Sequence, residues 1–239
     1  MHKKKFPLNF ETQKTYRNTT MGDAETVSVK VYVRLRPLVA RELEDCGGEI
    51  RWKYNNNAVV EDTGSGTKTR TFDGVMAPDS TNKDAYELIA KDMVEKSMTG
   101  HNATIFAYGQ TGSGKTWTMM GDDQGKHPGI IPLALQRIFK MMEERKSESI
   151  YSLKVSFMEI YNEQINDLLS EDPATGQNLP IKKDDPDKGA IIGNLTEVSV
   201  TSTAEALEAM ERGNSARQTA STQMNARSSR SHTVFRIVI

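Results

Sequence analysis

Eight consecutive residues have the types and the spacing of a phosphate-binding loop. Glycines let a backbone curl so that several N–H groups converge on phosphate oxygens. Lys115 adds a mobile positive charge for the β- and γ-phosphates, and Thr116 offers a hydroxyl to Mg²⁺. The motif predicts binding of a nucleoside triphosphate with Mg²⁺, but kinases, GTPases, motors and ABC-type ATPases all share it. The eight residues, which fit G-x-x-x-x-G-K-[ST] in full, are Gly109, Gln110, Thr111, Gly112, Ser113, Gly114, Lys115 and Thr116.

The sequence disfavours guanine as the base. GTPases read guanine with an Asn-Lys-x-Asp segment, and Asn82-Lys83-Asp84-Ala85 lacks the final Asp. This segment also opens a predicted helix far from the phosphate-binding loop in sequence. We interpret its similarity to the guanine motif as a coincidence.

A second polar cluster, Asn225 to His232, contains two arginines and three serines. By itself it is typical of a solvated Ser/Arg loop or of a phosphorylation site. Beside a phosphate-binding loop, it resembles a sensor of the γ-phosphate. Its hydroxyls would serve Mg²⁺ and water, and a guanidinium would lock a closed loop.

The hydrophobic pattern predicts alternating strands and helices around these two sites. Val27 to Leu35 alternates apolar and polar residues, as a strand with one buried face does. His101 to Tyr108 is predicted as a strand that leads into the phosphate-binding loop, and a helix is predicted directly after the loop. This alternation favours an α/β fold of three layers with a central mixed sheet. Further strands are expected at 50–60, 69–73, 152–160 and 232–239. Further helices are expected at 82–98 and 130–144, a short helical stretch is expected to end at Leu169, and another helix is expected to run from the capping box Ser202–Glu205 to Gly213 or beyond.

Composition excludes several other classes of protein. The chain has 239 residues and a formal net charge of −1, so no global field favours nucleic acid or an anionic membrane. Its single cysteine, Cys46, cannot form an internal disulfide or a zinc site of the usual multi-cysteine kind. No apolar run approaches the ~20 residues of a membrane helix, and no secretory signal is recognisable. We interpret residues 1–26 as a flexible extension.

Four blocks, in order, resemble the motor domain of the kinesin superfamily. The cluster at 225–232 resembles the kinesin switch I pattern N-x-x-S-S-R-S-H, and Arg34-Leu35-Arg36-Pro37 resembles the R-x-R-P element that lines adenine. Ile105 to Tyr108 has the kinesin form of the strand before the phosphate-binding loop, and Phe157 to Glu163 with Asp167 to Leu169 resembles the elements that follow. Among subfamilies, the centromere-associated (CENP-E-like, kinesin-7) kinesins are the most similar. Myosins share the Ser-Ser-Arg of switch I but differ in the phosphate-binding loop.

The resemblance implies contacts for the base and the ribose. Arg34, Arg36 and Pro37 would contact adenine or its ribose. Trp117 follows the phosphate-binding loop, where its ring either stacks on adenine or is a partly buried core aromatic.

The resemblance also implies roles near the γ-phosphate. Ser228 and Ser229 would approach the γ-phosphate and the Mg²⁺ shell, with Thr116 and Ser229 as the metal-binding residues. Arg230 would form the switch salt bridge, and Lys115 would stabilise developing charge. Arg217 corresponds to a kinesin arginine near the phosphate exit, or is a solvated helix-end arginine. His232 is expected to set loop geometry.

By this resemblance, residues 27–239 form a partial motor domain that ends after switch I and before switch II, so the fold is expected to be incomplete at its C-terminus. The complete motor would be an ATPase that uses ATP and Mg²⁺, binds microtubules and works in the cytoplasm on the cytoskeleton, with the spindle or the kinetochore as candidate locations. It would dimerise through a stalk and would bind neither nucleic acid nor a membrane. The alternative is a truncated, non-motile remnant that binds nucleotide without ATPase or motor activity.

Overall fold

The computed structural model describes residues 29–45, 52–122, 124–172, 174–185, 189–222 and 231–239. The predicted extension at 1–26 therefore lies outside the described residues. The chain divides into two compact units, one ending at Pro78 and the other beginning at Asp79. Within the described residues, no helix is both long and apolar enough to cross a bilayer.

The first unit contains two small sheets and one helix. A parallel pair joins β1 to β5, and an antiparallel meander joins β2, β3 and β4. The meander confirms the strands expected at 50–60 and 69–73, with the glycine-containing turn between β3 and β4. The elements of this unit are β1 (Tyr32–Arg34), α1 (Ala40–Asp45), β2 (Trp52–Tyr54), β3 (Ala58–Asp62), β4 (Thr67–Thr71) and β5 (Gly74–Met76).

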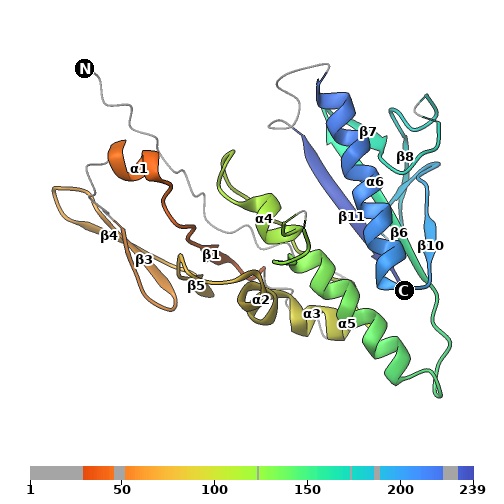
Figure 1. Ribbon diagram of the computed structural model, residues 1–239, viewed down its shortest axis with the longest axis horizontal. Helices are drawn as coiled ribbons and strands as arrows, with labels where there is room; N and C mark the ends of the chain where they lie inside the picture. The colour runs from red at the N-terminus through yellow and green to blue at the C-terminus, as the bar shows by residue number, and fades with distance from the viewer. Residues whose placement is uncertain (1–28, 46–51, 123, 173, 186–188, 223–230) are drawn as a thin grey trace. The chain divides into compact units, whose positions relative to one another are not determined.

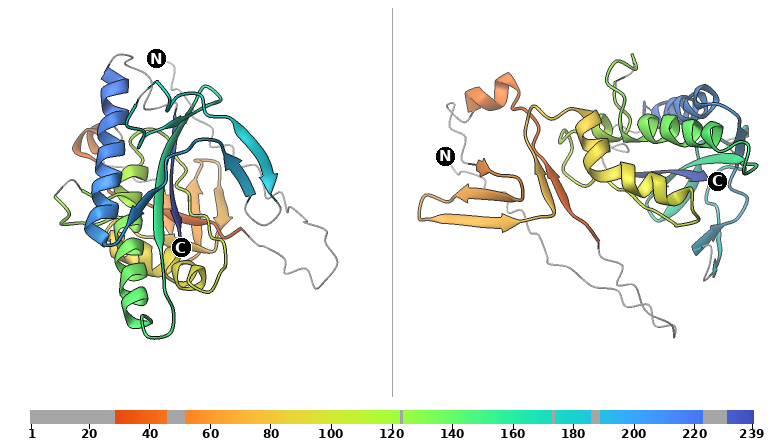
Figure 2. Two further views of the ribbon diagram at one scale, coloured as in Figure 1. Left: turned by 90° about the vertical axis from the view of Figure 1, so that its right-hand side faces the viewer. Right: turned by 90° about the horizontal axis from the view of Figure 1, so that it is seen from below.

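The second unit is built on an antiparallel sheet with the order β10-β6-β11, and β7 also pairs with β6. Figure 2 shows α5 and α6 beside this sheet, and their apolar residues form one core with those of β6. The elements are α2 (Asn82–Ala85), a π-helical turn η1 (Tyr86–Ala90), α3 (Lys91–Ser97), α4 (Lys115–Met119), α5 (Ile130–Glu144), β6 (Leu153–Tyr161), β7 (Gln164–Asp167), β8 (Ile181–Asp185), β9 (Gly189–Ile192), β10 (Val198–Val200), α6 (Thr203–Thr222) and β11 (His232–Val238).

The helix α6 lies against the strand β6 (Figure 1), and the two approach closely at Gly213. A Cβ added at Gly213 would lie 2.3 Å from Cδ1 of Phe157, so only a glycine fits there. The Phe157 ring is buried and meets Phe235 of β11 edge-on, with ring centroids 5.5 Å apart. One half of the predicted capping box is present, because Glu205 N–H donates to Ser202 Oγ, but the Glu205 carboxylate accepts from the N–H and hydroxyl of Thr201 rather than from the Ser202 N–H.

Two sequence predictions of local structure were wrong. The segment 101–108 is not a strand, since no described strand pairs with it, and Phe106 and Tyr108 are 72% and 88% exposed. The helical stretch expected before Leu169 is instead the strand β7. Asn162 and Glu163 both have positive φ, at 50° and 62°, and make a two-residue hairpin turn that returns the chain along β6.

The described strands also lie in four separate sheets rather than in one central sheet. Both parallel and antiparallel pairing occur, as expected for a mixed architecture, but in different sheets. The segment 101–108 leads directly into the phosphate-binding loop, so the loop is entered from a stretch that pairs with no strand among the described residues.

Candidate nucleotide-binding site

The phosphate-binding loop has the backbone curl that its motif predicts. Gly112 and Gly114 have φ values of 80° and 92°, in the left-handed region that favours glycine. Ser113 N–H donates to the Gln110 carbonyl at 3.1 Å and closes the turn. Gly114 is the N-cap of α4, so the loop passes into the helix at the predicted residue.

The Lys115 ammonium is held inside this loop. Its Nζ donates to the Gly109 carbonyl at 2.7 Å and to the Gln110 carbonyl at 2.9 Å. An ammonium has three donors and no acceptor, so these bonds keep a positive charge within the curl. Phosphate oxygens are hydrogen-bond acceptors and could replace the two carbonyls.

The residues present fit a Mg²⁺ ion that arrives with a nucleotide. Thr118 Oγ1 donates to the Gly114 carbonyl within α4, whereas the exposed Thr116 hydroxyl has no hydrogen-bond partner among the described residues. The described residues contain no group of three or more His, Cys, Asp or Glu that could hold a metal. Mg²⁺ commonly takes few protein ligands and completes its shell with phosphate oxygens and waters. A single hydroxyl from Thr116 suits that chemistry.

A buried asparagine fixes the far end of α4. Asn82 is 4% exposed, and its Nδ2 donates to the backbone carbonyls of Trp117 at 2.9 Å and His127 at 3.2 Å. These bonds tie α4 and the loop after it to α2. Asn82 belongs to the segment that resembles a guanine motif, and the structure gives it this packing role instead. The partners lie 35 and 45 residues away, so no local signal identified them.

Trp117 lies outside the hydrophobic core. Its side chain is 44% exposed, and its ring lies 5.6 Å from that of His127 at a 40° tilt. The structure therefore disagrees with the core alternative. Stacking of Trp117 on adenine stays a prediction.

The predicted adenine-contacting residues lie in the first unit. Arg34 ends β1, and Arg36 donates to both carboxylate oxygens of Glu42 in α1, at 2.7 and 2.5 Å, and to the Pro37 carbonyl. The hydrogen bond from Arg36 lowers the pKa of Glu42 to about 2. The roles of Arg34, Arg36 and Pro37 toward adenine stay predictions.

Three of the predicted γ-phosphate residues, Ser228, Ser229 and Arg230, lie outside the described residues. The last two residues of the cluster are described: Ser231 Oγ accepts a hydrogen bond from Arg217 Nη2 at 3.0 Å, and His232 begins β11. Arg217 Nε also lies 3.3 Å from an oxygen of the buried Glu159. The solvated alternative for Arg217 was therefore wrong, and the role of Glu159 was not predicted.

Comparisons with known proteins agree with this geometry. The family model for the kinesin motor domain matches residues 34–239. The chain is 42% identical over 219 residues to human centromere-associated protein E, covering 90% of this chain and 8% of that protein. It is 42% identical over 212 residues to the rice (Oryza sativa subsp. japonica) kinesin-like protein KIN-7D, chloroplastic, covering 89% of this chain and 20% of that protein.

A solved structure described as that of a fast kinesin has a TM-score of 0.80 at 37% identity, covering 88% of this chain and 59% of that chain. This likeness confirms the P-loop NTPase fold class. The chain covers only part of that motor. The chain spans a fifth or less of the length of the two curated relatives above. The model match covers nearly all of the described residues, and the phosphate-binding loop has the required backbone. The chain belongs to the kinesin motor domain family.

Proposed function

We propose that this chain binds Mg·ATP and, within the complete motor, hydrolyses it in a cycle coupled to microtubule binding. The observation that carries the proposal is the curled phosphate-binding loop with the Lys115 ammonium held inside it. Membership of the kinesin motor domain family supports ATP over other triphosphates and microtubules as the partner. It also supports a place on the cytoskeleton.

The loop residues would bind the phosphates and hold them in line for attack. Backbone N–H groups from Gly112 to Thr116 would donate to the β-phosphate oxygens, and Lys115 would move its donors from the two loop carbonyls to the β- and γ-phosphates. The Thr116 hydroxyl would face the metal. When bound there, Mg²⁺ would supply positive charge to offset that of the phosphates.

The cluster at 225–232 would complete the site on the γ-phosphate side. In our proposal Ser228 and Ser229 orient the γ-phosphate and the attacking water, and Arg230 locks the closed loop. Catalysis of this kind depends on positioning and electrostatics more than on covalent chemistry by the protein. Arg34, Arg36, Pro37 and Trp117 would select adenine.

A second candidate is a chain that binds nucleotide without motor activity. The observation that favours it is the segment 101–108, which pairs with no described strand and exposes Phe106 and Tyr108. A chain that kept this segment unpaired in solution would bind phosphate weakly and would not transmit a structural change.

Nucleotide binding by matched variants tests the site, and ATP turnover separates the two candidates. In the protein at its natural length, Lys115→Ala and Thr116→Asn should each weaken Mg·ATP binding, and Lys115→Ala by about 10- to 100-fold, as expected for lost charge-assisted hydrogen bonds. Lys140→Ala, on the exposed face of α5, is the matched control and should bind normally. Unchanged affinity in both loop variants would contradict the proposal. Binding without turnover would favour the second candidate.

A further inference from the structure

The strand β4 is the outer strand of the meander in the first unit. In the described part of the chain it pairs with β3 on one side and with no strand on the other. Its side chains are exposed apart from that of Arg70, which is partly buried. An unpaired edge presents backbone N–H and C=O groups that can bind another extended chain. A further strand could therefore be added at β4.

The hydrogen bonds at the two ends of the β3–β4 hairpin show which backbone groups face this edge. Thr63 N–H donates to the Gly66 carbonyl at 2.9 Å, and Phe72 N–H donates to the Asn57 carbonyl at 2.8 Å. Hydrogen-bonded and non-hydrogen-bonded pairs alternate along an antiparallel ladder. Every second residue pair between these two ends is therefore hydrogen-bonded.

This alternation turns the backbone of the threonines in β4 toward the free edge. Lys68 and Arg70 fall in the hydrogen-bonded pairs with β3, so the N–H and C=O groups of Thr67, Thr69 and Thr71 point away from it. On the free edge, Lys68 and Arg70 take the non-hydrogen-bonded positions. Facing Cα atoms there are about 4.5 Å apart rather than about 5.5 Å. The two basic side chains would thus lie close to those of an added strand.

The charge of this edge selects the kind of strand that can be added. Lys68 makes no ion pair with a described residue. Arg70 donates from Nη1 to Oε2 of Glu61 at 3.2 Å, and a guanidinium has five N–H donors, so it can serve a second carboxylate. The strand β4 contains no acidic residue. Because opposite charges at facing positions stabilise a strand pair, the edge favours an acidic partner.

The same charges disfavour a second copy of β4. Two such strands paired antiparallel about Thr69 would place Lys68 of each copy opposite Arg70 of the other. Like charges directly opposite each other are destabilising, and lysine on an edge strand is a common means of preventing self-pairing. The partner is therefore a different sequence.

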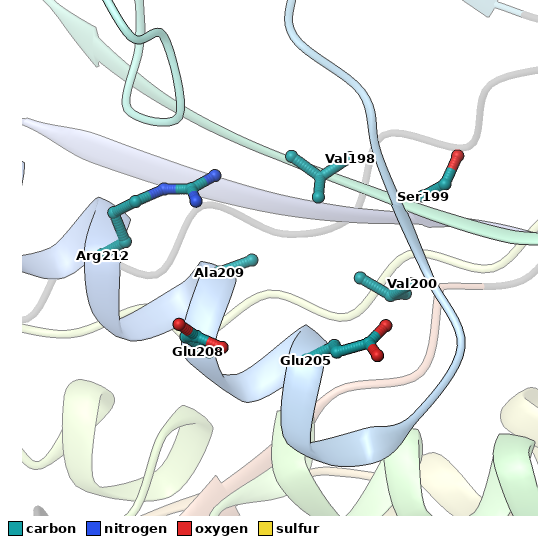
Figure 3. A pocket seen from close by; sticks show the side chains of 7 residues that line it. All are labelled: Val198, Ser199, Val200, Glu205, Glu208, Ala209 and Arg212. Carbon is teal, nitrogen blue, oxygen red and sulfur yellow. The ribbon is translucent and has the colours of Figure 1, made fainter.

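The edge strand β10 of the second unit does not suit an acidic chain. It has three residues, and Glu205 and Glu208 of α6 line the hollow beside it together with Arg212 (Figure 3). An acidic chain added at β10 would meet these two carboxylates. Of these two edges, β4 is the one whose charge matches an acidic segment.

We propose that the free edge of β4 binds an acidic, extended segment of another protein. The segment adds a strand to the meander and places carboxylates at alternate positions, opposite Lys68 and Arg70. Backbone hydrogen bonds to the three threonines supply affinity, and the two charges supply specificity. The site uses no residue of the phosphate-binding loop, so the inference goes beyond the proposed function and does not depend on it.

The test measures the binding of two end-blocked fluorescent peptides, Thr-Glu-Val-Glu-Thr and Thr-Lys-Val-Lys-Thr, to the protein at its natural length. Lys68→Glu reverses one charge of the edge. Thr69→Pro removes one outward N–H and keeps both charges, and proline is tolerated where the N–H of an edge strand faces solvent. Lys83→Glu, at an exposed position of α2, makes the same charge change in the second unit and is the matched control.

We expect the wild-type protein and the control to bind the acidic peptide at least tenfold more tightly than the basic one. Lys68→Glu and Thr69→Pro should each weaken binding of the acidic peptide by roughly fivefold, the size of one reversed charge pair or one hydrogen bond. The bound peptide should also slow hydrogen exchange at the amides of Thr67, Thr69 and Thr71.

Three results would overturn the inference. The first is equal binding of the two peptides. The second is a loss in Lys68→Glu without a loss in Thr69→Pro and without slower exchange, which would show attraction by charge alone. The third is a wild-type dimer in sedimentation that Thr69→Pro prevents, which would assign the edge to a second copy of this chain.

Discussion

The contact between α6 and β6 at Gly213 can be tested by adding one methyl group. In Gly213→Ala, the new Cβ would lie 2.3 Å from Cδ1 and 3.1 Å from Cε1 of Phe157, whereas carbon atoms in ordinary contact are about 3.5–4.0 Å apart. The ring is buried against Phe235 and cannot turn away freely. The clash must therefore move α6, the ring or both.

Two opposing terms decide the free energy of unfolding. Alanine in a helix interior is favoured over glycine by about 1 kcal/mol, and overpacking a core costs about 1–3 kcal/mol. The expected net effect of Gly213→Ala is a destabilisation of about 1 kcal/mol. Ala216→Gly, at an exposed position of the same helix, is the matched control that measures the propensity term alone, with an expected loss of about 1 kcal/mol.

The assay is urea unfolding followed by circular dichroism, with a double-mutant cycle. Phe157→Ala removes the ring atoms that the methyl group meets, so Gly213→Ala should become neutral or stabilising in that background, with a coupling energy of about 1–2 kcal/mol. The close packing would be refuted if Gly213→Ala stabilised the protein that keeps Phe157 by as much free energy of unfolding as Ala216→Gly removes.

The remaining predictions concern the buried Asn82 and the ion pair between Arg36 and Glu42. Asn82→Leu removes the donor to the backbone carbonyls of Trp117 and His127 and should lower the free energy of unfolding by about 1–3 kcal/mol. Lys83→Leu, at the exposed neighbouring position, is the control and should leave the free energy of unfolding unchanged. Equal effects of the two variants in urea unfolding would argue against the role of Asn82. The pKa of Glu42 is lowered from 4.5 to about 2 by Arg36, so the stabilisation from this pair should be complete above pH 4.5 and lost as the pH falls through 2. Arg36→Met should abolish that part of the acid dependence, measured as thermal unfolding between pH 5 and pH 2, and an unaltered profile would contradict the pairing.

Strong local patterns predicted much of the fold. The helix expected at 130–144 is α5 with the same bounds, because its apolar residues recur at helical spacing and face one core. The strands expected at 152–160 and 232–239 pair with each other as β6 and β11. The helix expected from Ser202–Glu205 onward is α6, which continues past Gly213 to Thr222.

The wrong predictions have physical causes that a local pattern does not contain. The apolar residues of 101–108 favour a strand, but a strand also needs a hydrogen-bonded neighbour, and the described residues supply none. The hairpin turn at Asn162 and Glu163 needs two residues with positive φ. Asparagine tolerates that conformation, whereas glutamate gives no such signal.

The candidate site was predictable only where its residues are adjacent in sequence. The phosphate-binding loop is a contiguous motif, and its backbone curl is confirmed. The supporting contacts of Asn82, and of Glu159 with Arg217, join residues 35 to 58 positions apart. Such contacts depend on how α2 meets α4 and how α6 crosses β6, which the local sequence does not specify.

The measurement that tests the central claim most directly is ATP turnover by the protein at its natural length, with and without microtubules, for wild type and Lys115→Ala. We expect microtubules to accelerate ATP turnover by the wild-type protein, and we expect Lys115→Ala to abolish turnover with and without microtubules. A turnover rate that ignores saturating microtubules, or one that survives the loss of Lys115, would contradict the account.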